Sequence, residues 1–228
     1  MKRVAIIPAR GGSKRIPRKN IRNFLGRPMI EYSIEAALGS ELFDLVIVST
    51  DDGQIAEIAR SAGAQVPFMR SAKAADDHAT TADVLVEVLS RLEEDGQYDL
   101  GCCIYPTAPF VTAARLREAA EIFENSDADR LLPVTRFSYP ILRSLSKDGE
   151  FVRFTWPEYA LTRSQDLAPA FHDAGQFYFF DVGSMLKTRQ LMTDATIGME
   201  IPSLETQDID EEADWHLAEL KYRQIHGL

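Results

Sequence analysis

Apolar runs that alternate with helical patterns constrain the fold of this chain more than any other feature of its sequence. Residues 2–8, 45–50 and 100–105 each contain several consecutive apolar positions. A strand that is apolar on both faces belongs in a sheet covered on both sides. Helical patterns at residues 30–38, 54–62, 81–92 and 112–124 supply the covering layers. We therefore predict an α/β fold, with a mostly parallel sheet and helices on both faces.

The rest of the chain adds two strands, one helix and one irregular segment. Residues 130–135 and 175–181 read as strands, residues 214–226 read as a helix, and the first predicted helix stops at Gly39. The segment 137–173 is rich in aromatic residues, Arg and Pro and shows no clear helix, so we expect a hairpin or excursion there. The length of 228 residues fits one domain spanning 1–228, with 137–173 as an extension.

Composition excludes several classes of protein. A formal net charge of −10 argues against general nucleic-acid binding, which needs an extended basic surface. No apolar run approaches the ~20 residues of a membrane span, and the apolar segment after Met1 is too short for a signal peptide. We therefore expect a cytoplasmic protein that acts away from the membrane.

Cys102 and Cys103 are neighbours in a strand and point to opposite faces, so we expect two buried thiols and no disulfide between them.

Basic residues are concentrated at the start of the chain. The first thirty residues hold nine Lys or Arg and no Asp or Glu, although the whole chain has 25 basic and 35 acidic residues. There the first strand enters a Gly11-Gly12 turn, whose backbone N–H groups can form a nest for phosphate oxygens. The turn has neither the Walker A pattern nor the dinucleotide fingerprint. A solvated basic turn is the alternative, but we favour a phosphate site served by Arg10, Lys14 and Lys19.

Acidic residues form a cluster before the last helix. Asp208 and Asp210 are separated by one residue, so in an extended segment both side chains project to one side. Two carboxylates suit Mg²⁺, whose remaining ligands are water and substrate phosphates. The same cluster also suits a solvated acidic cap at a helix N-terminus, and spacing alone leaves both interpretations open. The pair Asp51-Asp52 is a weaker metal candidate, since adjacent acids usually make a turn.

A third group of side chains suits a polyhydroxy carboxylate. Its members offer hydrogen-bond donors and planar faces, and Arg is the natural bidentate partner of a carboxylate. They are Arg163, Gln165, His172, Gln176 and Tyr178.

With these residues in place, the chain resembles the cytidylyltransferases of nine-carbon 3-deoxy-2-keto sugar acids, the CMP-sialic acid synthetase family. The resemblance runs nearly the full length. It rests on the phrase Ile6 to Lys14 followed by Pro17 and Lys19-Asn20, on Ser49 to Asp52, and on Asp208 to Asp210. The related synthetases for the eight-carbon acid Kdo typically have Tyr-Gly-Ser at the glycine turn, so Gly12 and Lys14 argue against them.

Two departures narrow the resemblance within this family. Sialic acid enzymes usually show Gly-Leu-Pro or Gly-Ile-Pro where this chain has Arg15-Ile16-Pro17. They usually have Gln-Pro-Thr-Ser-Pro after the third strand, where Tyr105 here replaces the Gln. Together with residues 173–178, these departures resemble the enzymes for pseudaminic acid, a diacetamido nonulosonic acid of bacterial flagellins and surface glycans.

The resemblance implies a reaction and a set of roles. The family transfers CMP from CTP to the anomeric 2-hydroxyl of the sugar acid and releases pyrophosphate, using Mg²⁺, in homodimers whose excursion reaches toward the partner's active site. The implied catalytic residues are Arg10, Lys19 and Asp210. The implied nucleotide site is Ala9, Arg10, Gly11, Gly12, Ser13, Lys14, Asn20, Arg70 and Thr80, with the Asp76–Thr81 loop near the base. The implied sugar site is Tyr105, Thr107, Arg163, Gln165, His172, Gln176 and Tyr178, and the implied metal ligands are Asp208 and Asp210.

Three alternatives remain open. The same reaction on legionaminic or N-acetylneuraminic acid is the nearest. A nucleotidyltransferase that joins UTP or GTP to a phosphosugar usually carries an Ala-Gly-Gly-x-Gly-Thr-Arg loop, which this chain lacks. A non-catalytic nucleotide sensor of the same fold has no need for the Asp208 and Asp210 pair.

Overall fold

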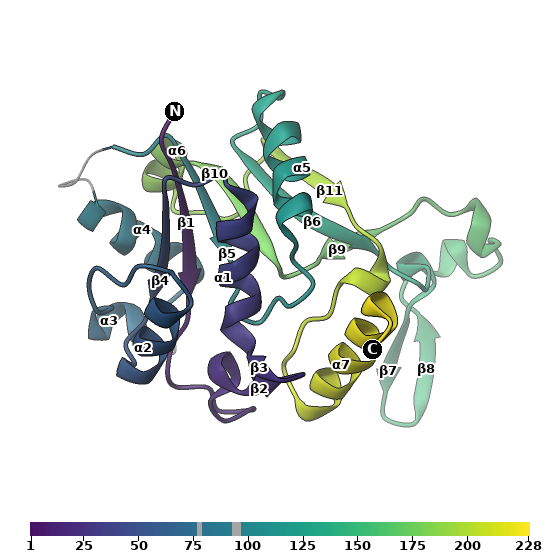
Figure 1. Cartoon of the computed structure of the whole chain (residues 1–228). Helices are drawn as coiled ribbons and strands as arrows, with labels where there is room; N and C mark the ends of the chain where they lie inside the picture. Colours follow the sequence, from purple (N-terminus) through teal and green to yellow (C-terminus); the bar gives the residue numbers. More distant parts are fainter. Residues whose placement is uncertain (77–78, 93–96) are drawn as a thin grey trace.

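A seven-stranded sheet forms the centre of the molecule (Figure 1). The computed structural model describes residues 1–76, 79–92 and 97–228. Six strands follow one another across the sheet in the order β11-β6-β10-β5-β1-β4, and β9 pairs with β6. Their bounds are β1 Arg3–Pro8, β4 Leu45–Ser49, β5 Leu100–Ile104, β6 Arg130–Arg136, β9 Phe171–Asp173, β10 Phe177–Asp181 and β11 Thr196–Glu200.

Strand directions confirm the predicted mostly parallel sheet. β1 pairs in parallel with both β4 and β5, and β6 pairs in parallel with β11. β10 lies antiparallel between β5 and β6, so those two strands point the same way. The inverted β10 and the short antiparallel β9 were not predicted, because an apolar run carries no information about strand direction.

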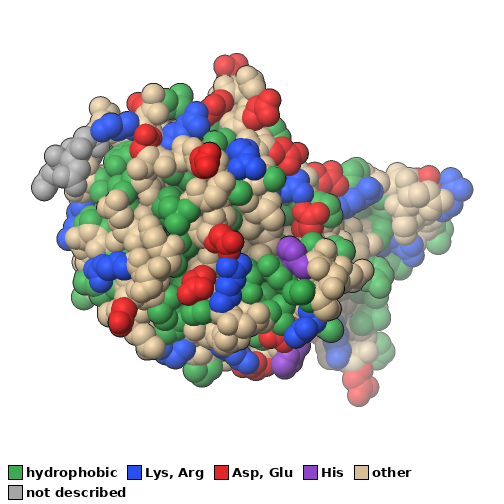
Figure 2. Space-filling view, in the orientation of Figure 1, with side chains coloured by type: hydrophobic (Ala, Val, Ile, Leu, Met, Phe, Trp, Pro, Cys, Tyr) green, Lys and Arg blue, Asp and Glu red, His purple; other side chains and the backbone are tan. Residues whose placement is uncertain are grey.

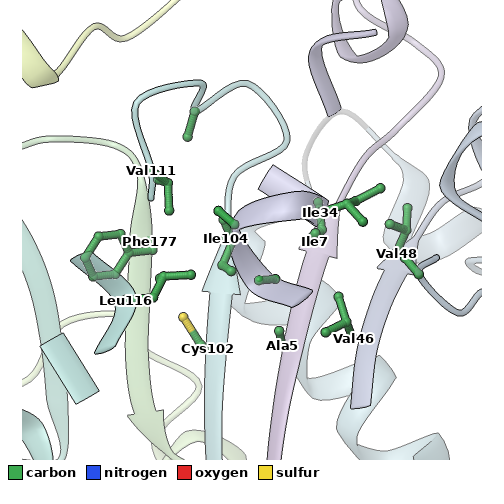
Figure 3. Packing of buried hydrophobic residues seen from close by; sticks show 14 of the residues in the cluster. Ala5, Ile7, Ile34, Val46, Val48, Cys102, Ile104, Val111, Leu116 and Phe177 are labelled. Atoms are coloured by element: carbon green, nitrogen blue, oxygen red, sulfur yellow. The ribbon is translucent and has the colours of Figure 1, made fainter. Parts of the chain in front are cut away.

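Helices cover both faces of the sheet, as the sequence predicted. One face packs against α1 (Met29–Ser40), α2 (Gly53–Ser61) and α5 (Ala113–Glu124), and Figure 3 shows the buried side chains of this layer. The other face packs against α4 (Thr81–Leu92) and α6 (Val182–Thr188). Cys102 belongs to the first layer and Cys103 to the second, and both are buried free thiols, as predicted.

The C-terminal helix α7 (Glu212–His226) packs on the segment that follows β1. Trp215 of α7 meets the ring of Phe24 edge-on at a centroid distance of 5.5 Å. The buried cluster between them also contains Ile16 and Ile209. That segment holds a 3₁₀ turn at Lys19–Ile21 and the short hairpin of β2 (Asn23–Phe24) and β3 (Arg27–Pro28). The last helix and the segment after β1 therefore pack against each other beside the sheet, although the N-terminus itself lies far from them (Figure 1).

Some element boundaries differ from the prediction. α1 runs through Gly39 and ends at Glu41, which adopts the left-handed conformation with φ 57°. The predicted stop at Gly39 was wrong, because the left-handed residue that ends the helix is Glu41, and Gly39 stays in the helix where α1 packs on α5. The sequence also gave no indication of α6, β11 or the short helix α3 (Ala72–Ala75).

Most of the segment 137–173 projects from the main body (Figure 1), but its last residues, Phe171–Asp173, form β9 and pair with β6 of the central sheet. It contains the hairpin of β7 (Leu145–Asp148) and β8 (Phe151–Phe154) and short 3₁₀ turns at Ile141–Arg143, Pro157–Tyr159 and Ser164–Asp166. A further 3₁₀ turn at Ser203–Glu205 precedes α7. Hydrophobic side chains are exposed on the excursion (Figure 2), including Phe151 at 77% and Trp156 at 43%. None of the helices in the described ranges is long and apolar enough to span a bilayer.

Candidate active site

A cleft of about 470 Å³ opens beyond the carboxyl ends of β1 and β5. The chain places β4 on one side of β1 and β5 on the other, and ligands bind at such a reversal of strand order. The residues that line the cleft come from the loops after both strands, from the start of α4 and from the approach to α7. They are Pro8, Arg10, Ser13, Lys14, Arg15, Lys19, Asn20, Arg70, Ala74, Asp76, Ala79, Thr81, Val84, Tyr105, Pro106, Thr107 and Asp210.

The glycine turn rests on the acidic turn after β4. The backbone N–H of Gly11 donates a 2.9 Å hydrogen bond to Asp51 Oδ1. A Cβ at Gly11 would come within 2.8 Å of Asp52 Oδ2, so no other residue fits without displacing Asp52. Asp52 in turn caps α2 and accepts a 2.6 Å hydrogen bond from Arg18. This bond lowers the pKa of the Asp52 carboxyl, with help from the backbone N–H of Ile55.

Other residues of the predicted phosphate site shape the loop from behind. Ala9 is buried, and its N–H donates to the Ser49 carbonyl at 2.9 Å. The Asn20 amide donates to the carbonyl of Arg10 at 2.9 Å. These bonds fix the shape of the loop, and the side chains of Arg10, Ser13, Lys14 and Lys19 line the cleft.

The basic loop and the acidic cluster meet, although nearly two hundred residues separate them. Lys19 Nζ donates to the carbonyl of Ile209 at 2.5 Å and lies 3.8 Å from Asp210 Oδ1. Arg15 Nη2 forms a 2.7 Å ion pair with Asp210 Oδ1. Burial lowers the pKa of Lys19; repulsion from Arg15 and Arg10 acts in the same direction, and attraction to Asp210 and Asp208 opposes it. The predicted cations and carboxylates therefore share one site.

The helix-cap interpretation of the acidic cluster holds for its later residues, Glu211 and Asp214. Glu211 and Asp214 form a capping box at the start of α7, and Asp214 Oδ2 accepts the backbone N–H groups of Asp210 and Glu211. Buried Ile209 anchors the segment, with Asp208 and Asp210 on either side of it. Partial desolvation raises the pKa of Asp208; Asp210 adds to the rise and Lys19 opposes it.

The carboxylates of Asp208 and Asp210 fit a magnesium ion whose other ligands are mainly water and phosphate oxygens. Within the described ranges, no three His, Cys, Asp or Glu side chains are grouped closely enough to hold a metal by themselves. Mg²⁺ is commonly bound through one or two protein carboxylates together with substrate phosphates. Asp208 and Asp210, next to a cleft lined by Lys and Arg, match that arrangement.

Arg70 is a buried residue and not a surface charge. It is 8% exposed, and its guanidinium donates to the carbonyl of Ser49 at 2.5 Å and lies 3.2 Å from the Ser49 hydroxyl. Burial lowers the pKa of Arg70, and the nearby Asp51 opposes the shift. The side chain is therefore fixed at the cleft wall.

The loop expected near the base is described only in part. Thr80 caps the start of α4, and its hydroxyl donates to Asp83 Oδ2 at 2.7 Å. Its neighbours Ala79 and Thr81 line the cleft. Two residues of the predicted Asp76–Thr81 loop, Asp77 and His78, lie outside the described residues.

Tyr105 lines the cleft, and buried Tyr178 packs against it. The rings of Tyr105 and Tyr178 lie 5.2 Å apart between centroids. Tyr105 Oη lies 3.3 Å from the Thr81 hydroxyl, and Tyr178 Oη donates to Asp173 Oδ2 at 2.7 Å. Burial raises the pKa of both phenols, so both stay protonated at neutral pH. Of the predicted sugar residues, Tyr105 and Thr107 line this cleft directly.

The other predicted sugar residues do not gather at the cleft within one chain. Gln176 is buried and donates to the carbonyl of Glu205 at 2.6 Å. His172 packs against Phe137 with 4.7 Å between the ring centroids. On the excursion, Arg163 pairs with Asp166 at 2.7 Å, and Gln165 lines a separate hollow.

Sequence reasoning gave no role in the site itself to Arg15 or Arg18, and it considered the Asp51-Asp52 turn only as a weaker metal candidate. Their contacts join loops that are distant in the sequence, such as the Arg18–Asp52 and Arg15–Asp210 pairs. The one available signal was position, because Asp51 and Asp52 directly follow a buried strand in the same way as the glycine turn does.

Comparisons with known proteins agree with this geometry. Residues 4–189 match the model of the Cytidylyltransferase family. The pseudaminic acid cytidylyltransferase of Campylobacter jejuni subsp. jejuni serotype O:2 is 41% identical over 99% of this chain and 98% of its own length. The CMP-N,N'-diacetyllegionaminic acid synthase of Legionella pneumophila subsp. pneumophila is 32% identical over 96% of this chain and 95% of its own.

Solved structures share the fold. A CMP:2-keto-3-deoxy-manno-octonic acid synthetase complexed with CTP matches with a TM-score of 0.70 at 19% identity and covers 100% of both chains. At that identity the likeness establishes the fold alone, and it confirms the predicted Rossmann-like nucleotidyltransferase architecture. With a family match over most of its length and relatives of 32–41% identity along nearly the whole chain, this protein belongs to the cytidylyltransferase family.

Proposed function

We propose that this protein is a CTP-dependent cytidylyltransferase that acts on pseudaminic acid. It transfers CMP from CTP to the anomeric 2-hydroxyl of the sugar acid and releases pyrophosphate. The observation that carries the proposal is the meeting of the basic loop after β1 with Asp210 in one cleft, with Asp208 near enough to Lys19 to attract its charge. The choice of sugar rests on the 41% identity to the pseudaminic acid enzyme.

The basic loop binds the triphosphate in this proposal. Arg10, Lys14 and Lys19 line the cleft and neutralise the charge of the departing pyrophosphate. Gly12 and Ser13 let the main chain approach the phosphates closely. Lys19 is held by the carbonyl of Ile209, so its ammonium is already oriented before the nucleotide arrives. Such preorganised charge is the main source of rate in phosphoryl transfer, where the protein has little covalent chemistry to do.

Asp208 and Asp210 would hold the magnesium ion. When bound, the ion would supply charge neutralisation at the α-phosphate and favour ionisation of the sugar hydroxyl. Within the chain, Asp210 is positioned by the hydrogen bond from its N–H to Asp214, which belongs to the cap of α7. The carboxylate is thereby fixed to the rigid start of a helix.

The cytosine lies against Arg70, Thr80 and the Asp76–Thr81 loop in this proposal. The support is that Arg70 is buried at the cleft wall and that Ala79 and Thr81 line the same cleft. A fixed guanidinium and main-chain groups can read the ring edge that distinguishes cytosine from uracil.

The sugar acid lies against Tyr105 and Thr107, with Gln176 and Tyr178 behind them. Arg163 and Gln165 of the excursion and His172 of β9 would complete its site from a second copy, because among the described residues of one chain Arg163 forms its ion pair with the neighbouring Asp166. We therefore propose a homodimer, supported by the exposed Phe151, Trp156 and Leu161 of the excursion. A monomer in light scattering at micromolar concentration would contradict this part of the proposal.

We place the enzyme in the cytoplasm, a prediction that cell fractionation tests.

The experiment that tests the function measures pyrophosphate release from each nucleotide and sugar pair. CTP is offered with pseudaminic, N,N'-diacetyllegionaminic and N-acetylneuraminic acids in Mg²⁺, and UTP and GTP serve as nucleotide controls. We expect the highest kcat/KM for CTP with pseudaminic acid. A higher kcat/KM with legionaminic acid would favour the second candidate, which the 32% identical relative supports. CTP binding without turnover of any sugar would favour a non-catalytic sensor.

A further inference from the structure

Arg15 occupies the carboxylate that the proposed magnesium ion needs. Its guanidinium forms a 2.7 Å ion pair with Asp210 Oδ1, and its side chain is largely exposed at the rim of the cleft. Lys19 lies against the same carboxylate at 3.8 Å. The two positive charges of Arg15 and Lys19 therefore balance the two negative charges of Asp208 and Asp210.

This balance removes the attraction that a free divalent cation would otherwise experience. A cation that approaches the pair is repelled by Arg15 and Lys19, and it must also displace Arg15 from Asp210 Oδ1. A triphosphate changes the balance, because its negative charges offer Arg15 a new partner in the same cleft. An exposed ion pair of this kind is weak enough to exchange partners.

We propose that Arg15 is a switching residue that couples metal binding to nucleotide binding. In the nucleotide-free protein it holds Asp210, and when CTP binds it moves to the triphosphate and leaves the carboxylate to the metal. The magnesium ion then enters with the nucleotide and not ahead of it. This inference rests on the metal site of the proposed function, and it assigns to Arg15 a positioning role in that site.

The inference predicts effects of opposite sign from one substitution. Arg15→Ala removes both the competitor for Asp210 and a repelling charge, so free Mn²⁺ should bind to the nucleotide-free protein roughly tenfold more tightly. The same variant lacks a cation for the triphosphate, so it should bind the preformed Mn²⁺–CTP complex several-fold more weakly, on the order of one charged contact. A role in folding or general stability would not move the two affinities in opposite directions.

The test measures Mn²⁺ binding to the full chain by electron paramagnetic resonance, with and without CTP and in the absence of sugar. Arg22→Gln is the matched control, because it removes one charge from the same segment and one ion pair with the same end of α7, the pair with Glu212. We expect this control to bind free Mn²⁺ as the wild type does. Arg15→Lys keeps the charge and should fall between the wild type and Arg15→Ala.

The outcomes separate this inference from the metal assignment. If Arg15→Ala binds free Mn²⁺ no more tightly than the wild type or Arg22→Gln, the switching role is overturned. The switching role would also be overturned if Arg15→Ala bound both free Mn²⁺ and Mn²⁺–CTP more tightly than the wild type. Arg15 would then act only as a distant charge that repels the metal. If the tightening persists in the double variant with Asp210→Ala, the metal lies elsewhere, and the metal assignment falls as well.

Discussion

The two ends of the cleft are built differently. At the nucleotide end, the loop after β1 is tied to the turn after β4 through Gly11 and Arg18, and to the approach to α7 through Arg15 and Lys19. At the sugar end, Arg163 lies on an exposed excursion and pairs only with a residue three positions away. One chain therefore brings the proposed nucleotide residues together, whereas our proposal needs a second copy to bring Arg163 and Gln165 to the sugar.

The largest expected effect tests the nucleotide end. Asp210→Ala should lower the turnover number about 10²–10³-fold, because the metal and the basic loop both lose a preorganised charge partner. Pyrophosphate release measures the loss, and circular dichroism should show a folded protein, since the Asp210 side chain is partly exposed. Glu212→Gln, which removes a carboxylate two residues away, should change turnover less than about threefold. Wild-type activity of Asp210→Ala in Mg²⁺ would contradict the metal assignment.

A smaller effect is expected at the sugar end. Arg163→Ala should raise the KM for the sugar acid by roughly 10–100-fold, the usual size of a lost charged hydrogen bond, and leave the KM for CTP unchanged. Arg153→Ala is the matched control, because Arg153 also lies on the excursion and pairs with an exposed carboxylate, Asp148. Initial rates measured with the sugar acid varied, and then with CTP varied, would give the two KM values separately. An equal rise in the KM for CTP would break the proposed division between the two ends.

Substitution in the glycine turn tests whether close packing shapes the nucleotide end. In Gly11→Ala the new Cβ would lie 2.8 Å from Asp52 Oδ2, so Asp52 must leave its place as the cap of α2. We expect a loss of about 1 kcal/mol in the free energy of unfolding and a rise of about tenfold in the KM for CTP. In Gly12→Ala no atom lies within 4 Å of the new Cβ, so its free energy of unfolding should not change. Equal destabilisation in urea unfolding would refute this account.

The smallest expected effect concerns pH. The pKa of Lys19 is lowered, so its ammonium loses its proton at a lower pH than an ordinary lysine, and kcat/KM for CTP should fall in alkaline solution by about threefold or more. Lys19→Arg keeps the charge, and its profile should stay flat over the same range. Stability should move oppositely: between the lowered pKa and 10.5 the unfolded chain binds more protons, so the free energy of unfolding rises with pH. A parallel alkaline fall in both proteins would show that Lys19 is not the titrating group.

The fold was largely predictable because its strands are apolar on both faces. β1, β4 and β5 are buried between two helical layers, so their sequences carry a clear pattern. β11 was missed because it is a half-exposed edge strand that contains a glycine, and α6 because it follows β10 without an intervening turn. Periodicity reports burial, and it is weakest where an element is short or at an edge.

The site was predictable where function demands several charges in one segment. Residue type alone identifies two candidate groups. They are the glycine turn with Arg10, Lys14 and Lys19, and the Asp208–Asp210 pair. The part played by Arg15 and Asp51 depends on contacts between distant loops, which residue type alone does not reveal. Arg163 and Gln165 were chosen for their chemistry, but they lie on a segment that leads away from the cleft. Suitable residue types therefore do not by themselves place a residue at the site.

The measurement that tests the contrast between the two ends most directly mixes two impaired proteins, at a sugar concentration far below the KM of Arg163→Ala. Asp210→Ala lacks its own nucleotide end, and Arg163→Ala lacks the residue that it would lend to its partner. In a mixed dimer, one of the two sites then has both its own Asp210 and a partner's intact excursion. After the subunits are exchanged in equal amounts, we predict recovery of roughly a quarter of wild-type pyrophosphate release, as random pairing in a twofold dimer requires. No recovery, in a mixture shown to contain mixed dimers, would contradict the claim that one chain builds the nucleotide end and two copies build the sugar end.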